Sequence, residues 1–329
     1  MKFGVELVPN NPIDEVLKWA SVAEQKKFDY IWVTDHFNNR NTYVTLTSIA
    51  LKTTSVRIGP GVTNPYLINP AWTASAMASL SEVSKGRAVL GIGAGDRTTL
   101  GYLGLEQKSP VAALAECVSI IRGLLKGDEV KLPGKVFNVS GARLSYQPDF
   151  VPIYLGVQGP KMLHLAAQIS DGVLVNASDP AEISLAVREV RSGLDEASRP
   201  SSDFDIAAYT SFSVDTDPAI AMKLARPVVA FIAAASPDSV LERHGISPEL
   251  IQTIRTALGK GQFKEAFKAV NDELLEVFSI TGTPSQVTEK ISAILKEGVS
   301  QLVIGSPIGV DKVKTLESVG SEIIPHFLQ

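Results

Sequence analysis

Short apolar segments alternate with longer amphipathic segments along almost the whole of this 329-residue chain. The short segments have the length and composition of buried strands, and we expect strands at residues 2–8, 30–34, 56–59, 88–92, 151–157, 172–175, 204–214 and 301–304. Apolar residues at helical spacing follow them, and we expect helices at residues 13–26, 43–52, 70–84, 111–125, 159–168, 181–197, from 283 and at 311–328. Eight strands, each followed by helical material, predict an α/β fold: a (β/α)8 TIM barrel in which residues 1–329 form a single domain.

An open, doubly wound sheet is the alternative fold. Such a sheet more often has six strands and a GxGxxG fingerprint after the first strand, and Val5 to Asn10 contain no such motif. Two segments are longer than ordinary loops, at about residues 127–150 and at the wholly helical residues 217–278. Insertions of this length in a barrel are expected at the carboxyl ends of the strands, where they cover the mouth or contact another subunit.

Charge and composition exclude several classes of partner. The 31 basic and 35 acidic residues are interspersed, and no basic block indicates nucleic acid. The chain begins directly with a strand, and the apolar run at residues 227–235 is too short to span a membrane, so we expect a cytoplasmic protein without a membrane partner. The single cysteine, Cys117, lies in an apolar helical stretch and is expected to be buried. With four scattered histidines and no HExxH motif, no metal site is expected.

Chemistry in a barrel is located at the carboxyl ends of the strands, and Glu6 stands out there. Its neighbours Val5 and Leu7 face the other side of the first strand, so Glu6 is expected to point into the barrel. A carboxyl group in such surroundings has a raised pKa, which suits it to acid–base catalysis. The alternative is a structural acid paired with an interior arginine or lysine.

The third strand leads into a segment rich in glycine and proline. Gly59, Pro60, Gly61 and Pro65 follow it directly, and such residues are used where the backbone takes an unusual path or approaches a ligand closely. An exposed hairpin would accept the same residues. At the active end of a barrel we interpret them as a backbone surface for a flat cofactor.

Three further strand ends are candidates for binding. Asp35-His36 is either a ligand-binding pair or a hydrogen-bonded strand terminus. The GIGAGD sequence at residues 91–96 is a weak nucleotide-loop match that a tight turn would also explain. The GVQGPK sequence at residues 156–161 precedes a helix whose N-terminus could accept phosphate beside Lys161, although a plain strand–helix turn is the alternative.

These segments together resemble the bacterial-luciferase-like flavin and deazaflavin barrels, a resemblance that the late sequences GTPSQV (282–287) and GVSQLVIG (298–305) extend. Within that superfamily, MKFGVELVP at the start, Asp35-His36 and GAGDRTTL (93–100) are similar to the family of coenzyme F420-dependent 5,10-methylenetetrahydromethanopterin reductases of methanogenic archaea. The resemblance covers the full length of the chain.

The resemblance implies that F420 binds at the strand ends, over a bulge with a non-prolyl cis peptide expected at Gly61–Val62. The residues implied around the deazaflavin head are Asp35, Gly61, Val62, Thr63, Gly93, Ala94, Gly95 and Asp96. Those implied at its tail and phosphate are Gln158, Gly159, Asn176, Ala177 and Ser178. The insertion from Gly127 would contribute to the pterin side and to a subunit contact in a homodimer or homotetramer.

The implied activity is a step of one-carbon metabolism in methanogenesis. Reduced F420 donates a hydride to 5,10-methylenetetrahydromethanopterin, or its tetrahydrosarcinapterin form, and yields the 5-methyl compound. Glu6 is the expected general acid for the leaving nitrogen. Asp96 is the other candidate proton donor, although with Asp35 it is more suited to orienting the ring. The alternatives are an FMN-dependent monooxygenase, an F420-dependent alcohol or sugar-phosphate dehydrogenase with His36 as base, and a non-catalytic flavin-binding protein.

Overall fold

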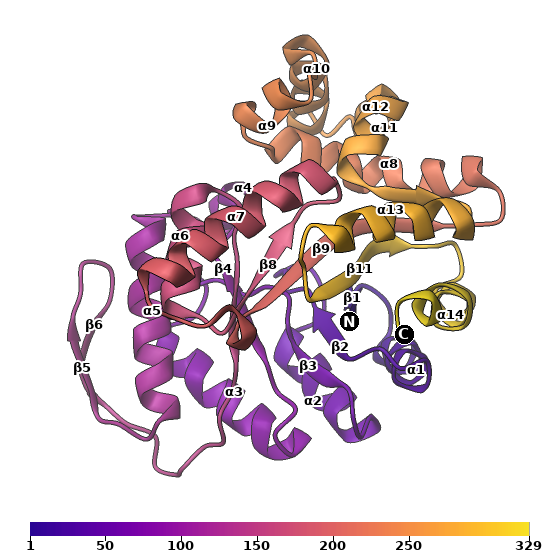
Figure 1. The fold of residues 1–329 in the computed structure, drawn as a ribbon. Coiled ribbons are helices and arrows are strands. Elements are labelled where there is room, and N and C mark those ends of the chain that lie inside the picture. Colours follow the sequence, from indigo (N-terminus) through magenta and orange to yellow (C-terminus); the bar gives the residue numbers. More distant parts are fainter. Residues whose placement is uncertain (329) are drawn as a thin grey trace.

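The structure, a computed structural model, describes residues 1–328 and contains a barrel of eight parallel strands (Figure 1). They are β1 (Lys2–Leu7), β2 (Tyr30–Val33), β3 (Arg57–Pro60), β4 (Leu90–Gly93), β7 (Ile153–Gly156), β8 (Gly172–Asn176), β9 (Asp205–Val214) and β11 (Gln301–Ile308). Their order is β3-β2-β1-β11-β9-β8-β7-β4, and two isolated parallel bridges join β4 back to β3. The predicted TIM barrel is therefore confirmed, and the open sheet is excluded.

Helices cover the outside of the barrel (Figure 1). They are α1 (Ile13–Gln25), α2 (Thr42–Lys52), α3 (Pro70–Ser84), α5 (Pro110–Leu125), α6 (Pro160–Ile169), α7 (Pro180–Glu196), α13 (Pro284–Lys296) and α14 (Lys312–Ser318). Side chains at the N-caps explain several starts: Asn69 and Asp179 accept backbone N–H groups, and Thr283 and Gln286 form a capping box. The expected helix at 311–328 is shorter, because the chain after Ser318 continues as a π turn and then a 3-10 turn.

Apolar side chains fill two regions of the barrel. The larger core lies between strands and helices and includes Cys117, which is buried and free as expected. The second lies inside the barrel and consists of Tyr30, Trp32, Val89, Tyr154, Leu174, Ala207 and Val303. This interior packing closes the barrel below the strand ends, so ligands can enter only at the mouth.

A polar network closes the amino-terminal end of the barrel. Asp205, at the start of β9, accepts a hydrogen bond from the Tyr154 hydroxyl (2.8 Å), another from Gln301 Nε2 (3.2 Å), and pairs with the Lys2 ammonium (3.1 Å). Gln301 Oε1 in turn accepts from Trp32 Nε1 (3.1 Å). The buried side chains of this network, Asp205, Tyr154, Gln301 and Trp32, are therefore all hydrogen-bonded.

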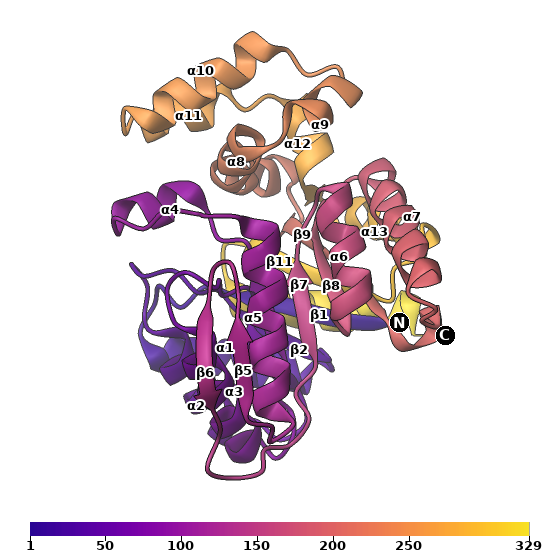
Figure 2. The same cartoon turned by 90° about the vertical axis from the view of Figure 1, so that its left-hand side faces the viewer.

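The first insertion contains an antiparallel hairpin that lies along α5 (Figure 2). Its strands are β5 (Val130–Pro133) and β6 (Asn138–Ala142). The carboxylate of Glu116 on α5 accepts the backbone N–H groups of Lys135, Val136 and Phe137 at the turn, at 2.7–2.9 Å. The hairpin was not predicted within residues 127–150, and neither were α4 (Arg97–Tyr102) and the short strand β10 (Ile280–Gly282), which pairs with β9.

The second insertion is helical and stands as a separate layer over one side of the barrel in both views (Figures 1 and 2). It consists of α8 (Pro218–Ala235), α9 (Asp238–Arg243), α10 (Pro248–Gly259), α11 (Phe263–Ala269) and α12 (Asp272–Phe278). An apolar cluster of its own holds these helices together, with Val229, Ile251, Ile254, Val270 and Leu274 fully buried. The predicted helical character of residues 217–278 is confirmed.

Helix α8 differs from the expectation at one point. The helix contains Pro227 and spans 18 residues in all, Pro218–Ala235, with a mean hydropathy of 1.5. The expectation that the apolar segment here is too short to span a membrane was therefore wrong, because the whole helix has the required length. Length and composition alone do not separate a membrane span from a packed helix. Here α8 carries Lys223 and Arg226, packs against β9 and the other insertion helices, and Arg226 donates to the Val270 carbonyl oxygen.

Candidate active site

A cavity of about 550 Å³ opens at the carboxyl ends of the barrel strands. Eleven of the sequence-predicted site residues line it: Glu6, Asp35, Gly61, Val62, Thr63, Gly93, Ala94, Gly95, Asp96, Gln158 and Asn176. Other lining residues that the sequence did not single out include Thr34, Asn64, Leu100, Met162, Leu174 and Tyr209. The predicted head-binding residues, which come from the ends of β2, β3 and β4, are thus brought together around one space.

A second cavity of about 360 Å³ shares Gln158 and Asn176 with the first. The remaining predicted tail residues, Gly159, Ala177 and Ser178, line it, together with residues of α7 and of the helical insertion. Lys161 lies in the first turn of α6, but its side chain is exposed and lines neither cavity. The two cavities form adjoining compartments for a long ligand.

The backbone bulge after β3 forms one wall of the main cavity. The bridges Ile58–Ala88 and Thr63–Ile92 enclose residues 59–62 on one side and 89–91 on the other, so the β3 side has one residue more. The Gly61–Val62 peptide inside this bulge is cis, as expected from the resemblance. A Cβ on Gly61 would lie 2.6 Å from Cβ of Trp32, which excludes any larger residue there.

Glycines opposite the bulge make room for the Val62 side chain. A Cβ on Gly91, Gly93 or Gly156 would lie only 2.9–3.1 Å from a Val62 methyl group. These distances are shorter than ordinary van der Waals contacts, so β4 and β7 must carry glycine at these positions. The Val62 side chain, which lines the cavity, therefore packs against glycine backbone of β4 and β7.

Glu6 lies at the inner end of this cavity, and one of its carboxyl oxygens accepts the Ser306 backbone N–H at 2.6 Å. The pairing of β11 with β9 shifts register between Ile304 and Pro307, which places Ser306 at this point. Burial raises the pKa of Glu6, while the Ser306 hydrogen bonds and the charges of His36 and Lys312 act in the opposite direction. Among residues 1–328 no lysine or arginine forms an ion pair with Glu6, contrary to the structural alternative.

Tyr209 is the residue beside Glu6 that the sequence analysis missed. It comes from β9, lines the same cavity, and its hydroxyl donates a hydrogen bond to the Gly61 carbonyl oxygen at 3.2 Å. Alternation along β9 was a usable signal, because Ala207, two residues earlier, belongs to the barrel interior.

Several buried polar atoms at the cavity have no partner among the described residues. Asp35 accepts from Thr42 Oγ1 at 2.9 Å through one oxygen, while its other oxygen is buried and free. The hydroxyls of Thr34 and Thr63 are also buried without a partner. Buried polar groups are normally satisfied, so these three atoms point to a polar ligand that completes their hydrogen bonds.

Asp96 has a structural task that its sequence context did not show. It is the N-cap of α4 and accepts the Thr99 backbone N–H at 2.7 Å, and its side chain is exposed. Gln107 supports the same loop by donating to the carbonyl oxygens of Ala94 (3.0 Å) and Gly95 (2.8 Å). Gln107 thus holds the backbone of residues 94–96, which line the cavity.

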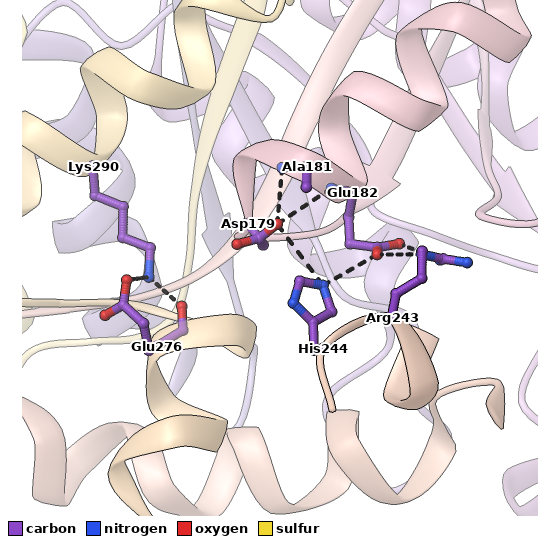
Figure 3. Close-up of polar contacts among 7 residues, drawn as sticks. All are labelled: Asp179, Ala181, Glu182, Arg243, His244, Glu276 and Lys290. Carbon is purple, nitrogen blue, oxygen red and sulfur yellow. Dashed lines mark hydrogen bonds and ion pairs between the residues drawn. The ribbon is translucent and has the colours of Figure 1, made fainter. Parts of the chain in front are cut away.

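Ion pairs attach the helical insertion beside the second cavity (Figure 3). Glu182 of α7 binds the Arg243 guanidinium through both oxygens, at 2.9 and 2.7 Å, and contacts His244 Nε2 at 3.1 Å. The hydrogen bond and charge of Glu182 raise the pKa of Arg243. Asp179, the N-cap of α7, lies 3.8 Å from the same His244 nitrogen. One acidic helix start therefore holds α9 over the barrel.

Metal ligands are not grouped in this structure. Among residues 1–328, no set of three His, Cys, Asp or Glu side chains lies close enough together to hold a metal ion.

Comparisons with known proteins agree with this geometry. The model of the luciferase-like monooxygenase family matches residues 1–301. The chain is 49% identical to 5,10-methylenetetrahydromethanopterin reductase of Archaeoglobus fulgidus, over 99% of this chain and 100% of the relative, and 46% identical to that of Methanolobus tindarius, over 98% and 100%. The solved structure of coenzyme F420-dependent tetrahydromethanopterin reductase from Methanopyrus kandleri superimposes with a TM-score of 0.93 at 41% identity, covering 99% of both chains.

Proposed function

We propose that this chain, which belongs to the luciferase-like monooxygenase family and within it to the 5,10-methylenetetrahydromethanopterin reductases, reduces 5,10-methylenetetrahydromethanopterin or its tetrahydrosarcinapterin form with reduced coenzyme F420. The product is the 5-methyl compound, and the step belongs to the one-carbon metabolism of methanogenesis. The observation that carries the proposal is Glu6, a carboxyl group with a raised pKa that lines a glycine-walled cavity and forms no ion pair with a lysine or arginine of residues 1–328.

The residues of the main cavity fit a flat, polar ring system. Gly61, Gly93 and Gly156 leave a surface without side chains, and the free oxygen of Asp35 and the Thr34 and Thr63 hydroxyls are unsatisfied at its edge. We assign the ring to Asp35, Gly61, Val62, Thr63, Gly93, Ala94, Gly95 and Asp96. We assign the tail and phosphate to Gln158, Gly159, Asn176, Ala177 and Ser178 beside the second cavity.

When bound, reduced F420 supplies the hydride that becomes the third hydrogen of the methyl group. The chain supplies the proton: Glu6 protonates the ring nitrogen whose bond to the methylene carbon breaks, so that nitrogen leaves as a neutral amine. A positioned acid of this kind contributes about 10²–10⁴-fold in rate. The raised pKa keeps Glu6 protonated to higher pH than an ordinary carboxyl group, which is the state the reaction needs.

We assign Asp96 to orientation rather than proton donation. Its carboxylate caps α4 and lies exposed where it lines the cavity. The carboxylate oxygens there are suited to accept hydrogen bonds from ring N–H groups.

We also propose that the protein is a cytoplasmic homo-oligomer, a dimer or a tetramer. Helices α2 and α3 present Val44, Leu51 and Trp72 to solvent, with exposed fractions of 62%, 76% and 72%. Adjacent exposed apolar side chains of this size are typical of a protein–protein contact. Light scattering of the purified protein and of Trp72→Glu tests this: we expect the variant to lose mass by dissociation, and an unchanged mass would contradict the assignment of this face.

An anaerobic assay with purified protein tests the activity. We expect reduced F420 to be oxidised only when the methylene pterin is present. The return of F420 absorbance measures this oxidation. A secondary alcohol or a sugar phosphate with oxidised F420, and FMN with oxygen, serve as the competing reactions. Turnover with one of these and none with the pterin would contradict the proposed function.

A further inference from the structure

Tyr209, on β9, lines the same cavity as two other parts of the site, the bulge after β3 and Glu6 on β1. Its hydroxyl donates to the Gly61 carbonyl oxygen at 3.2 Å, and Tyr209 and Glu6 line the same cavity. Strand β11 separates β1 from β9, but it presents Gly305 at this level, and a Cβ there would lie 3.3 Å from a Glu6 oxygen. Strand β11 therefore places no side chain between Glu6 and Tyr209 at Gly305.

We propose that Tyr209 is a positioning residue that acts through Glu6, by accepting a hydrogen bond from the protonated acid and donating one to its carboxylate. This inference rests on the proposed function in one respect, because it takes Glu6 as the proton donor. It adds to that function a second residue, Tyr209, whose hydroxyl changes from acceptor to donor when Glu6 loses its proton.

The number of available protons explains why the Tyr209 hydroxyl changes its hydrogen-bond partner. A tyrosine hydroxyl has one proton to donate and lone pairs to accept. With Glu6 protonated, its proton points to Tyr209 and the Tyr209 proton points to the Gly61 carbonyl oxygen, so all groups are satisfied. After Glu6 transfers its proton to the substrate nitrogen, the Tyr209 hydroxyl rotates and donates to the new carboxylate. The charge then receives two hydrogen bonds, from Ser306 and from Tyr209.

Tyr209 itself stays neutral throughout this cycle. Burial raises the pKa of Tyr209 well above its usual value, and the Glu6 charge and hydrogen bond add to the shift. The tyrosine is therefore not a second acid. Its contribution is to stabilise the carboxylate that forms as Glu6 loses its proton. This hydrogen bond lowers the free-energy cost of a negative charge in the buried site.

The test is Tyr209→Phe, with the Glu6 pKa measured directly in the protein without cofactor. Carbon-detected NMR of protein labelled at glutamate side chains reports this pKa, and Glu6→Gln identifies the signal. We expect the pKa of Glu6 to rise by about one unit, because the carboxylate loses a donor. In turnover we expect kcat to fall about 10- to 100-fold and its decline at alkaline pH to move to higher pH.

Tyr66→Phe is the matched control, since the Tyr66 hydroxyl also donates to a backbone carbonyl oxygen, that of Lys108 at 2.8 Å, outside the cavity. It should leave the Glu6 pKa and the pH profile unchanged. An unchanged Glu6 pKa in Tyr209→Phe would overturn the inference. A change in F420 affinity alone would also overturn it, because Tyr209 would then act only through its hydrogen bond to the Gly61 carbonyl oxygen. Because the pKa measurement needs no substrate, it stands apart from the assay: an inactive wild type would refute the proposed function alone.

Discussion

At the scale of single residues, Glu6 and Asp96 are two carboxyl groups at one cavity in different surroundings. Glu6 is held by one backbone amide in a site where burial raises its pKa, whereas Asp96 is an exposed helix cap. Their different burial and hydrogen-bond partners therefore separate their roles.

The separation predicts different losses for the two isosteric variants. Glu6→Gln should lose about 10²–10⁴-fold in kcat because the amide cannot supply the proton that the leaving nitrogen needs. Asp96→Asn should lose much less kcat and mainly raise KM, since asparagine still caps α4. Steady-state kinetics of both variants measure this. If Asp96→Asn is the inactive variant and Glu6→Gln keeps most of its rate, the assignment of the acid is wrong.

The raised pKa of Glu6 also predicts a pH dependence of stability. The folded chain holds this proton to higher pH than the unfolded chain, so the free energy of unfolding falls as pH rises from the ordinary carboxyl range through the raised pKa. Glu6→Gln removes the effect, so thermal unfolding should show the variant more stable than wild type at about pH 8 and nearly equal near pH 4. Asp96→Asn is the control with the same charge change on an exposed side chain. A Glu6→Gln variant less stable at every pH would contradict the account.

At the scale of elements, the attachment of the helical insertion depends on α7. Glu182 binds both Arg243 and His244, and all three residues lie at or beside the second cavity (Figure 3). Glu182→Gln should therefore weaken F420 binding several-fold and speed hydrogen exchange in α9, while global stability falls by about 1 kcal/mol or less. Fluorescence titration and hydrogen exchange measure the two effects.

Glu276→Gln is the matched control for this prediction. Glu276 pairs with Lys290 at 2.9 Å on the other side of the insertion, and Lys290 also contacts the Glu276 carbonyl oxygen, which the substitution keeps. Glu276 lines neither cavity. Equal loss of F420 affinity in both variants would contradict the prediction, because the Glu182 contacts would then be no more important for F420 binding than the Glu276 contacts.

Which elements could be predicted depends on where their stabilising contacts come from. The eight barrel strands were recognisable because each is a local apolar run, and the β9 alternation even contained the signal for Tyr209. The three-residue β10 exists because β9 offers an edge, and the β5–β6 turn is held by Glu116 from an earlier helix. Such contacts are tertiary and leave no local pattern. The roles of Asp96 and Ser306 depend likewise on neighbours that only the fold supplies.

At the scale of the whole molecule, the helical insertion has an apolar cluster of its own but returns to the barrel through β10, which pairs with β9. Helix α8 also packs against β9 and β11. We therefore propose that residues 1–329 unfold as one domain. Calorimetry should show a single transition with equal calorimetric and van't Hoff enthalpies. Two separate transitions, with the insertion melting first, would contradict a single domain.

The central claim is a direct hydride transfer into the methyl group at this barrel mouth, with the proton supplied by the chain. The most direct measurement uses reduced F420 carrying deuterium at the transferred position, and the product is analysed by mass spectrometry after one turnover in ordinary water. The account predicts one deuterium in each 5-methyl product, and no deuterium from solvent when the isotopes are reversed. A product without the label would contradict it, because the hydrogen would then have come from water.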